Sequence, residues 1–103
     1  VISGGFNVYP KEIESEIDAM PGVVESAVIG VPHADFGEGV TAVVVCNKGA
    51  EVTEAGVLNA LDGRLAKFKM PKRVFVVEEL PRNAMGKVQK NILRDTYAKI
   101  YAK

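Results

Sequence analysis

The sequence has no tryptophan and only one cysteine and one histidine among its 103 residues. A single cysteine cannot form an internal disulfide, which excludes a disulfide-stabilised scaffold and favours a reducing compartment, so we expect a cytoplasmic location. The longest uninterrupted apolar run, residues 42–46, is far short of the about 18 residues that span a bilayer. His33 has no Cys, Asp or Glu at the spacing of a metal-binding motif, and we expect no metal site.

The composition is that of one folded domain. Apolar residues make up 48% of the chain and charged residues 25%, which excludes intrinsic disorder, and the length fits a single core. The chain begins at Val1, without methionine and inside an apolar stretch. We therefore expect it to be one part of a longer protein.

The formal net charge is zero, but the charges are unevenly distributed along the chain. Residues 1–62 contain two basic and ten acidic side chains, whereas residues 63–103 contain eleven basic and three acidic ones. The basic half suits an anionic partner such as phosphate groups or nucleic acid. Alternatively, the two halves neutralise each other within one fold, and the charge pattern leaves both interpretations open.

The spacing of apolar residues predicts three helices and three strands after a short extended lead. The helices are expected from Pro10 to the Pro21-Gly22 pair, from a Thr53 cap through Phe68, and over residues 89–101. The strands are expected over residues 23–31, 40–46 and 73–79, with residues 32–39 as a loop. This order predicts an α+β fold in which a small mixed β-sheet is flanked by helices.

Residues 80–90 (LPRNAMGKVQK) form the first candidate site. Gly86 gives the backbone freedom before Lys87, whose compact positive charge suits a phosphate or a carboxylate. A nucleotide-binding P-loop is a poor match, because Val88 stands where Ser or Thr is required and no glycine lies five residues before Gly86. The alternative is an ordinary solvated loop lysine.

The second candidate site is the segment around Gly4 and Gly5. Two glycines let the backbone approach a ligand closely, and Phe6 or Tyr9 could line a channel. The alternative is a hairpin turn followed by the start of a helix. Composition and spacing alone indicate no more than an α+β domain suited to anion binding.

Taken together, these segments resemble the C-terminal domain of adenylate-forming acyl-CoA synthetases. Residues 5–14 (GFNVYPKEIE) are similar to the segment that follows the hinge of this family, and residues 28–32 (VIGVP) and 69–73 (KMPKR) to later landmarks. The spacing of Pro81, Gly86, Lys87 and Lys90 resembles the motif that closes the family's sequences. The landmarks cover nearly the whole chain, although Asn83, Ala84 and Lys90 depart from the commonest residues of that motif.

The resemblance implies that residues 1–103 are the C-terminal AMP-binding-enzyme domain of an acid–CoA ligase. Such enzymes use ATP and Mg²⁺ to form an acyl-adenylate and then transfer the acyl group to coenzyme A, and this domain swings between the two steps. Lys87 falls on the catalytic adenylation lysine, and Gly4, Gly5, Phe6 and Asn7 fall on the loop that binds substrate and coenzyme A. The implied partner is the N-terminal domain of the same chain, with neither nucleic acid nor membrane involved.

Three finer expectations accompany this resemblance. Residues 68–73 and 83–91 look most like the malonyl-CoA synthetase branch, which makes malonate or methylmalonate the expected acid. Lys72 or Arg73 is expected to meet the phosphates of coenzyme A, and a lysine acetyltransferase and deacetylase are expected to modify Lys87. The isolated domain is expected to be inactive. A small-ligand-binding regulatory module of ferredoxin-like type is the alternative function.

Overall fold

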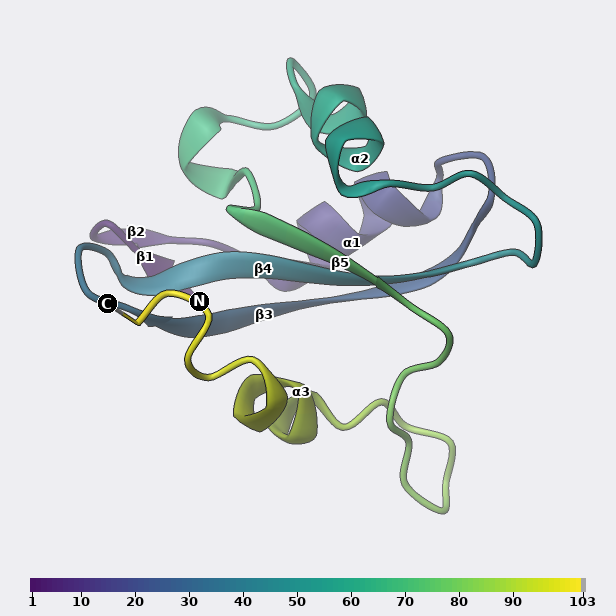
Figure 1. The fold of residues 1–103 in the computed structure, drawn as a ribbon. Helices are drawn as coiled ribbons and strands as arrows, with labels where there is room; N and C mark the ends of the chain where they lie inside the picture. The colour runs from purple at the N-terminus through teal and green to yellow at the C-terminus, as the bar shows by residue number, and fades with distance from the viewer. Residues whose placement is uncertain (103) are drawn as a thin grey trace.

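The computed structural model describes residues 1–102, which form a sheet with helices on both faces. In chain order the elements are β1 (Ile2–Ser3), β2 (Phe6–Asn7), α1 (Pro10–Asp18), β3 (Val23–His33), β4 (Gly37–Cys46), α2 (Glu54–Leu61), the 3₁₀ turn η1 (Lys67–Lys69), β5 (Arg73–Val77) and α3 (Lys90–Thr96). Figure 1 shows α1 and α2 on one face of the sheet and α3 on the other. The predicted α+β class is confirmed.

The sheet is mixed and is organised around β4. This strand pairs with β3 in antiparallel fashion along its whole length and with β5 in parallel fashion from Thr41 to Val45. The short β1 meets β4 at one pair, Ser3 with Gly37, and β2 lies outside β1. Because β4 is covered on both faces, it is almost continuously apolar, as expected for a central strand.

Two apolar clusters hold the helices on the sheet. Ile13 and Ile17 lie one turn apart on α1 and are fully buried, together with Val40, Ala42 and Val44 of β4. On the opposite face, α3 buries Leu93 against a second cluster. The alternation of side chains along β4 therefore supplies both cores at once.

Several element boundaries differ from the predictions, among them the end of β5, which lies at Val77 instead of residue 79. The segment 32–39, predicted as a loop, continues β3 and β4 into a tight hairpin, because Pro32 and His33 pair with Glu38 and Gly37. The second helix ends at Leu61 instead of Phe68, since Gly63 adopts a positive φ of 86°. The last helix ends at Thr96, and the following residues turn back across the sheet.

The uneven charges meet in ion pairs between the two halves of the chain. Each of the five salt bridges found among residues 1–102 joins an acidic side chain of the first 62 residues to a basic side chain of the remainder. They are Arg64–Glu16, Lys69–Glu12, Arg73–Glu54, Arg82–Glu25 and Lys90–Glu14. Much of the charge asymmetry is thus neutralised within the fold.

Across residues 1–102, no helix combines the length and the apolar character that crossing a membrane requires.

Candidate functional site

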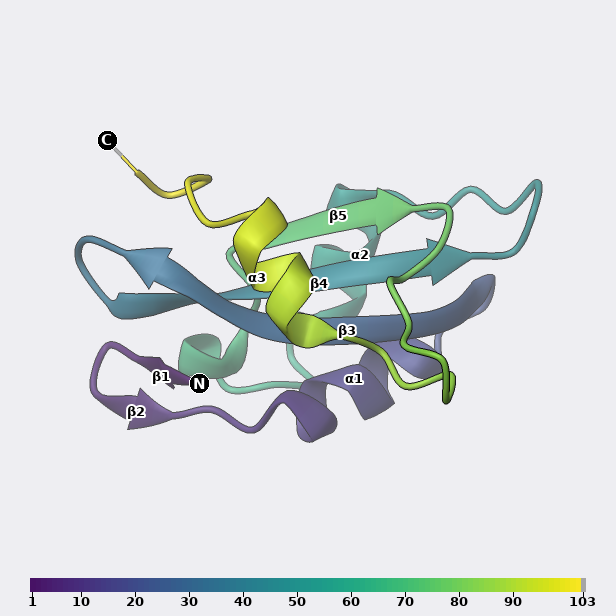
Figure 2. The same cartoon turned by 90° about the horizontal axis from the view of Figure 1, so that it is seen from below.

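The two predicted segments lie at opposite ends of the sheet. Figures 1 and 2 show the β1–β2 hairpin at one end and the loop between β5 and α3 at the other, in both orientations. Each end of the sheet therefore carries a separate candidate site.

The first site is built on the β1–β2 hairpin. Gly4 and Gly5 form its two-residue turn with φ values of 59° and 85°, a pair of positive angles that matches a type I′ turn and favours glycine. The Gly4 amide donates to the carbonyl of Phe36 at 3.0 Å, which ties the turn to the tip of the β3–β4 hairpin. The alternative interpretation of this segment, a hairpin followed by a helix start, is confirmed as its local structure.

A cavity of about 260 Å³ opens between this hairpin, the β3–β4 turn and η1. Its walls contain three phenylalanines and two lysines. The lining residues are Ser3, Gly4, Phe6, Phe36, Lys67, Phe68, Met70 and Lys72. Of the four predicted binding residues, Gly4 and Phe6 line it, whereas Gly5 and Asn7 are exposed beside it and are not among the lining residues.

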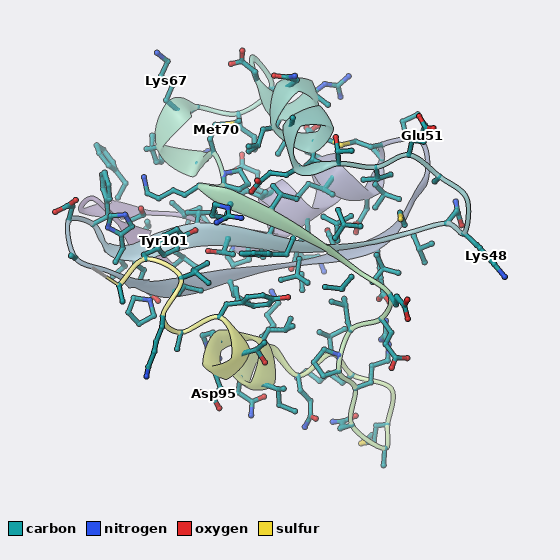
Figure 3. The ribbon with its side chains drawn as sticks, in the orientation of Figure 1. Lys48, Glu51, Lys67, Met70, Asp95 and Tyr101 are labelled. Atoms are coloured by element: carbon teal, nitrogen blue, oxygen red, sulfur yellow. The ribbon has the colours of Figure 1, made fainter. Side chains whose placement is uncertain are left out.

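Aromatic rings and ammonium groups are combined in this cavity. Phe6 stacks on Phe68 with ring centroids 4.6 Å apart, and the Lys72 Nζ lies 3.6 Å from the centroid of the Phe36 ring. Lys67 extends away from the sheet into solvent (Figure 3). Flat apolar surfaces beside a positive charge suit a ligand with a planar ring and anionic groups.

Sequence reasoning missed the aromatic walls of this cavity. Phe68 was expected on the apolar face of a helix, but it lies within the short η1 turn and remains 38% exposed. Phe36 was part of a predicted loop and carried no role. A phenylalanine among polar and glycine residues in a turn was the available signal, because such a ring is costly to expose without a contact partner.

The second site is the loop that carries Lys87. The loop is closed by a bridge between Arg82 and Val88, and the Asn83 Oδ1 accepts hydrogen bonds from the Met85 amide at 2.9 Å and from the Lys87 amide at 3.0 Å. The Arg82 guanidinium also donates to the Gly86 carbonyl at 2.7 Å. The backbone of Lys87 is therefore held in place while its side chain is exposed.

Several basic side chains surround an open hollow beside Lys87. Lys90 and Arg94 of α3 line the same hollow, and the Lys90 Nζ is neutralised by Glu14 at 2.8 Å. Within residues 1–102 neither Lys87 nor Arg94 takes part in a salt bridge. Their charges are thus available to an anion.

No metal site was found among the described residues. Within residues 1–102, no three His, Cys, Asp or Glu side chains lie close enough together to hold an ion.

The family of the chain follows from comparison with known proteins. Residues 12–87 match the family described as the AMP-binding enzyme C-terminal domain. The chain belongs to this family. The match extends as far as Lys87.

Relatives of this C-terminal domain include ligases of several acids. The chain is 48% identical over 98 residues to the long-chain-fatty-acid–CoA ligase FadD13 of Mycobacterium tuberculosis, covering 95% of this chain and 19% of that protein. It is 48% identical over 95 residues to a 4-chlorobenzoate–CoA ligase of an Arthrobacter species, covering 90% of this chain and 18% of the other.

Among solved structures, apo MatB from Rhodopseudomonas palustris superposes with a TM-score of 0.97 at 80% identity, over 98% of this chain and 20% of that one. The chain thus spans about one fifth of the length of the relatives it matches.

Proposed function

We propose that this domain is part of an acid–CoA ligase, to which it contributes Lys87 for adenylation and the β1–β2 cavity for thioester formation. The observation that carries the proposal is the family match through Lys87, together with a preorganised loop that presents this lysine to solvent. The relatives that share the domain are named as CoA ligases. The enzyme is expected to act in the cytoplasm.

Lys87 offsets the charge repulsion that opposes adenylation. A carboxylate oxygen has to approach the α-phosphate of ATP, and both groups are negatively charged. An ammonium on a long stem can enter the site and stabilise the charge that develops at the phosphate. Mg²⁺ supplies further charge neutralisation when bound, and we assign the binding of ATP and Mg²⁺ mainly to the N-terminal domain expected in the same chain.

The β1–β2 cavity suits coenzyme A, which combines a planar adenine, phosphate groups and a narrow pantetheine arm. The phenylalanines offer flat surfaces to such a molecule, and the glycine turn leaves room for a narrow chain. Between the two expected phosphate contacts, Lys72 is favoured because it lines the cavity, whereas Arg73 is held by Glu54 at 2.8 Å.

The separation of the two sites supports a reorientation of the domain during the reaction. With Lys87 at one end of the sheet and the cavity at the other, one fixed placement against the N-terminal domain cannot bring both to the same acyl group. We infer that the domain presents Lys87 first and the cavity second, as the family resemblance implies.

The proposed acid is malonate or methylmalonate. The support is the 80% identity with the domain of MatB, a malonyl-CoA synthetase. Because ligases of fatty and aromatic acids also share nearly half of the sequence, the choice of acid is expected to depend on the rest of the protein. Malonate-dependent pyrophosphate exchange by the full-length ligase, compared with exchange on hexanoate and benzoate, tests this assignment.

Half-reaction kinetics of the full-length ligase test the role of Lys87. Lys87→Ala should lower the rate of ATP–pyrophosphate exchange about 10²- to 10³-fold, the usual effect of removing one preorganised charged donor. Thioester formation from supplied acyl-adenylate should be retained. Lys48→Ala removes another exposed lysine, in the β4–α2 loop, and should change neither rate. Equal loss of both half-reactions in Lys87→Ala would indicate a folding defect and contradict the proposal.

We further propose that acetylation of Lys87 switches the ligase off, through a lysine acetyltransferase that a deacetylase opposes. Acetylation removes the positive charge on which the adenylation step depends, and Lys87 is exposed on its loop. Peptide mass spectrometry after brief incubation with an acetyltransferase from the same cell should find the label concentrated at Lys87. Labelling spread evenly over Lys48, Lys67, Lys87 and Lys99 would contradict this, as would full adenylation activity of protein modified only at Lys87.

A further inference from the structure

The C-terminal tail, the residues that follow α3, lies against the sheet and contains Tyr101, whose side chain packs at a defined position. The Tyr101 hydroxyl lies 2.8 Å from the Thr41 hydroxyl, and Thr41 is completely buried in β4. The Tyr101 ring covers Gly39, where a Cβ atom would lie only 2.6 Å from the Tyr101 Cε2. Only glycine leaves room for the ring at this position. Burial raises the pKa of the Tyr101 phenol above its ordinary value, which keeps its proton available for this contact.

Aromatic contacts connect Tyr101 to the β1–β2 cavity. The His33 ring lies against Tyr101, with centroids 5.0 Å apart, and contacts Phe36 edge to face at 4.8 Å. Phe36 in turn forms a wall of the cavity, below the ammonium of Lys72. Figure 3 shows Tyr101 against the sheet, and Figure 2 shows the β3–β4 turn between the C-terminal tail and the β1–β2 hairpin.

The Phe36 ring depends on contacts from outside the β3–β4 turn, because the turn itself buries little of it. It is 39% exposed at the tip of the β3–β4 hairpin. Its backbone carbonyl is fixed by the Gly4 amide, but its ring is restrained by two side chains, His33 on one side and Lys72 at its face. The Asp35 amide donates to the His33 Nδ1 at 3.0 Å, so this ring is held at one edge by its own turn and on its other side by Tyr101. Removing the ring of Tyr101 would take away the second of these contacts and loosen His33 and, through it, Phe36.

We propose that Tyr101 is a positioning residue for coenzyme A, which acts through His33 to hold Phe36 in the wall of the cavity. This rests on the proposed function, in which that cavity binds coenzyme A. The tail beyond α3 then does more than cover the sheet. It sets the affinity for the thiol substrate through Tyr101 and His33, which do not themselves line the cavity.

The experiment measures the full-length ligase with two readouts, the KM for coenzyme A and the rate of ATP–pyrophosphate exchange. Tyr101→Ala should raise the KM about 2- to 10-fold, the effect expected from losing aromatic contacts, with the exchange rate unchanged. Tyr101→Phe keeps the ring and should restore a KM close to that of the parent. His33→Ala leaves the contacts of Tyr101 with Thr41 and Gly39 intact and should also raise the KM for coenzyme A. It replaces Tyr101→Ala as the test if that variant does not fold.

Tyr97→Ala is the matched control. Tyr97 belongs to the same tail and stacks on Phe75 at 4.5 Å, and no aromatic contact found among residues 1–102 joins it to the β3–β4 turn. Its removal should lower stability without changing the KM for coenzyme A. A KM raised equally by Tyr97→Ala and Tyr101→Ala would indicate general loosening of the tail and overturn the proposal.

Phe36→Ala distinguishes the proposal that the cavity binds coenzyme A from the proposal that Tyr101 positions Phe36. It should raise the KM, and adding Tyr101→Ala to it should have no further effect, because both changes act through one ring. If Phe36→Ala and Lys72→Ala both leave the KM unchanged, coenzyme A does not bind in this cavity, and both proposals fall. If Phe36→Ala raises the KM while Tyr101→Ala and His33→Ala do not, only the role of the tail is overturned.

Discussion

Glu54 connects the first turn of α2 to β5 through a single carboxylate. Its Oε2 accepts hydrogen bonds from the Val74 amide and from the Arg73 guanidinium, each at 2.8 Å. The backbone hydrogen bond from Val74, with the bond from Arg73, holds the pKa of this carboxyl below its ordinary value. Because the folded-state pKa is lowered, the stabilisation is complete above the pKa of an unfolded glutamate, about 4.3. It is lost as the pH falls through the lower folded-state value.

Glu54→Gln should therefore lower the free energy of unfolding at pH 7 by roughly 1 kcal/mol, because solvent screens the ion pair at this exposed site. Urea denaturation at several pH values provides the measurement. The difference between parent and variant should shrink as the pH falls below about 4. A difference that stays constant from pH 7 to pH 3 would show that the charge of Glu54 contributes nothing.

At the scale of single residues, the sequence drew attention to Lys87 because it follows a glycine in a polar loop. Its role in adenylation comes from the family resemblance and stays a prediction. Phe36 and Tyr101 were not assigned roles, because Phe36 contacts Lys72, 36 residues away in the sequence, and Tyr101 contacts Thr41, 60 residues away. No local spacing encodes such a contact. The sequence also gives no sign that position 39 must be glycine, because this requirement arises from the ring of Tyr101 packed against it.

At the scale of elements, the helix and strand types were predicted but their ends were not. The leucine spacing of α2 continues past Leu61, yet Gly63 turns the chain and places Phe68 at the cavity. Pro32 indicated a loop, but it stands near the end of β3, where pairing with Glu38 on one side tolerates it. In both cases the periodicity predicted the element, but its end was decided by the backbone conformation of Gly63 for α2 and by pairing with β4 for β3.

The β1–β2 turn offers a test with an internal control. Gly5 has a φ of 85° and open space around it, and Gly49 in the β4–α2 loop has a φ of 84° and the same open space. Leucine at either position strains the backbone by a similar amount, about 1–2 kcal/mol. Only Gly5→Leu adds a side chain beside the cavity.

In the full-length ligase, Gly5→Leu should slow thioester formation at least tenfold while ATP–pyrophosphate exchange stays near the parent rate, because it obstructs only the approach of the thiol. Gly49→Leu should leave both rates close to those of the parent despite equal strain. Stopped-flow measurement of acyl transfer from preformed acyl-adenylate separates these cases. Parallel losses in the two half-reactions of Gly5→Leu would show that the hairpin supports the fold and has no part in thiol access.

At the scale of the whole molecule, the division of charge supports folding. The five ion pairs join the acidic first part of the chain to the basic second part, so the opposite charges that the sequence separates are brought together by the topology. Within residues 1–102, Lys87 and Arg94 remain outside these pairs at one end of the sheet, and Lys67 and Lys72 remain outside them at the cavity of the other end. The basic character that indicated an anionic partner is thereby divided between the two sites.

This arrangement predicts how the chain behaves apart from the rest of the ligase. By itself it offers Lys87 and a small cavity at opposite ends of the sheet, so the 103-residue chain should show no ATP–pyrophosphate exchange. Mixed with the separately produced N-terminal part, it should restore exchange in proportion to its concentration, without saturating at micromolar levels. A short linker supplies an effective concentration in the millimolar range, and two separate parts lose that advantage. Exchange should depend on Lys87, so the same chain with Lys87→Ala should restore none. Exchange by the isolated chain, or equal rescue by Lys87→Ala, would contradict the division of labour proposed for the two parts.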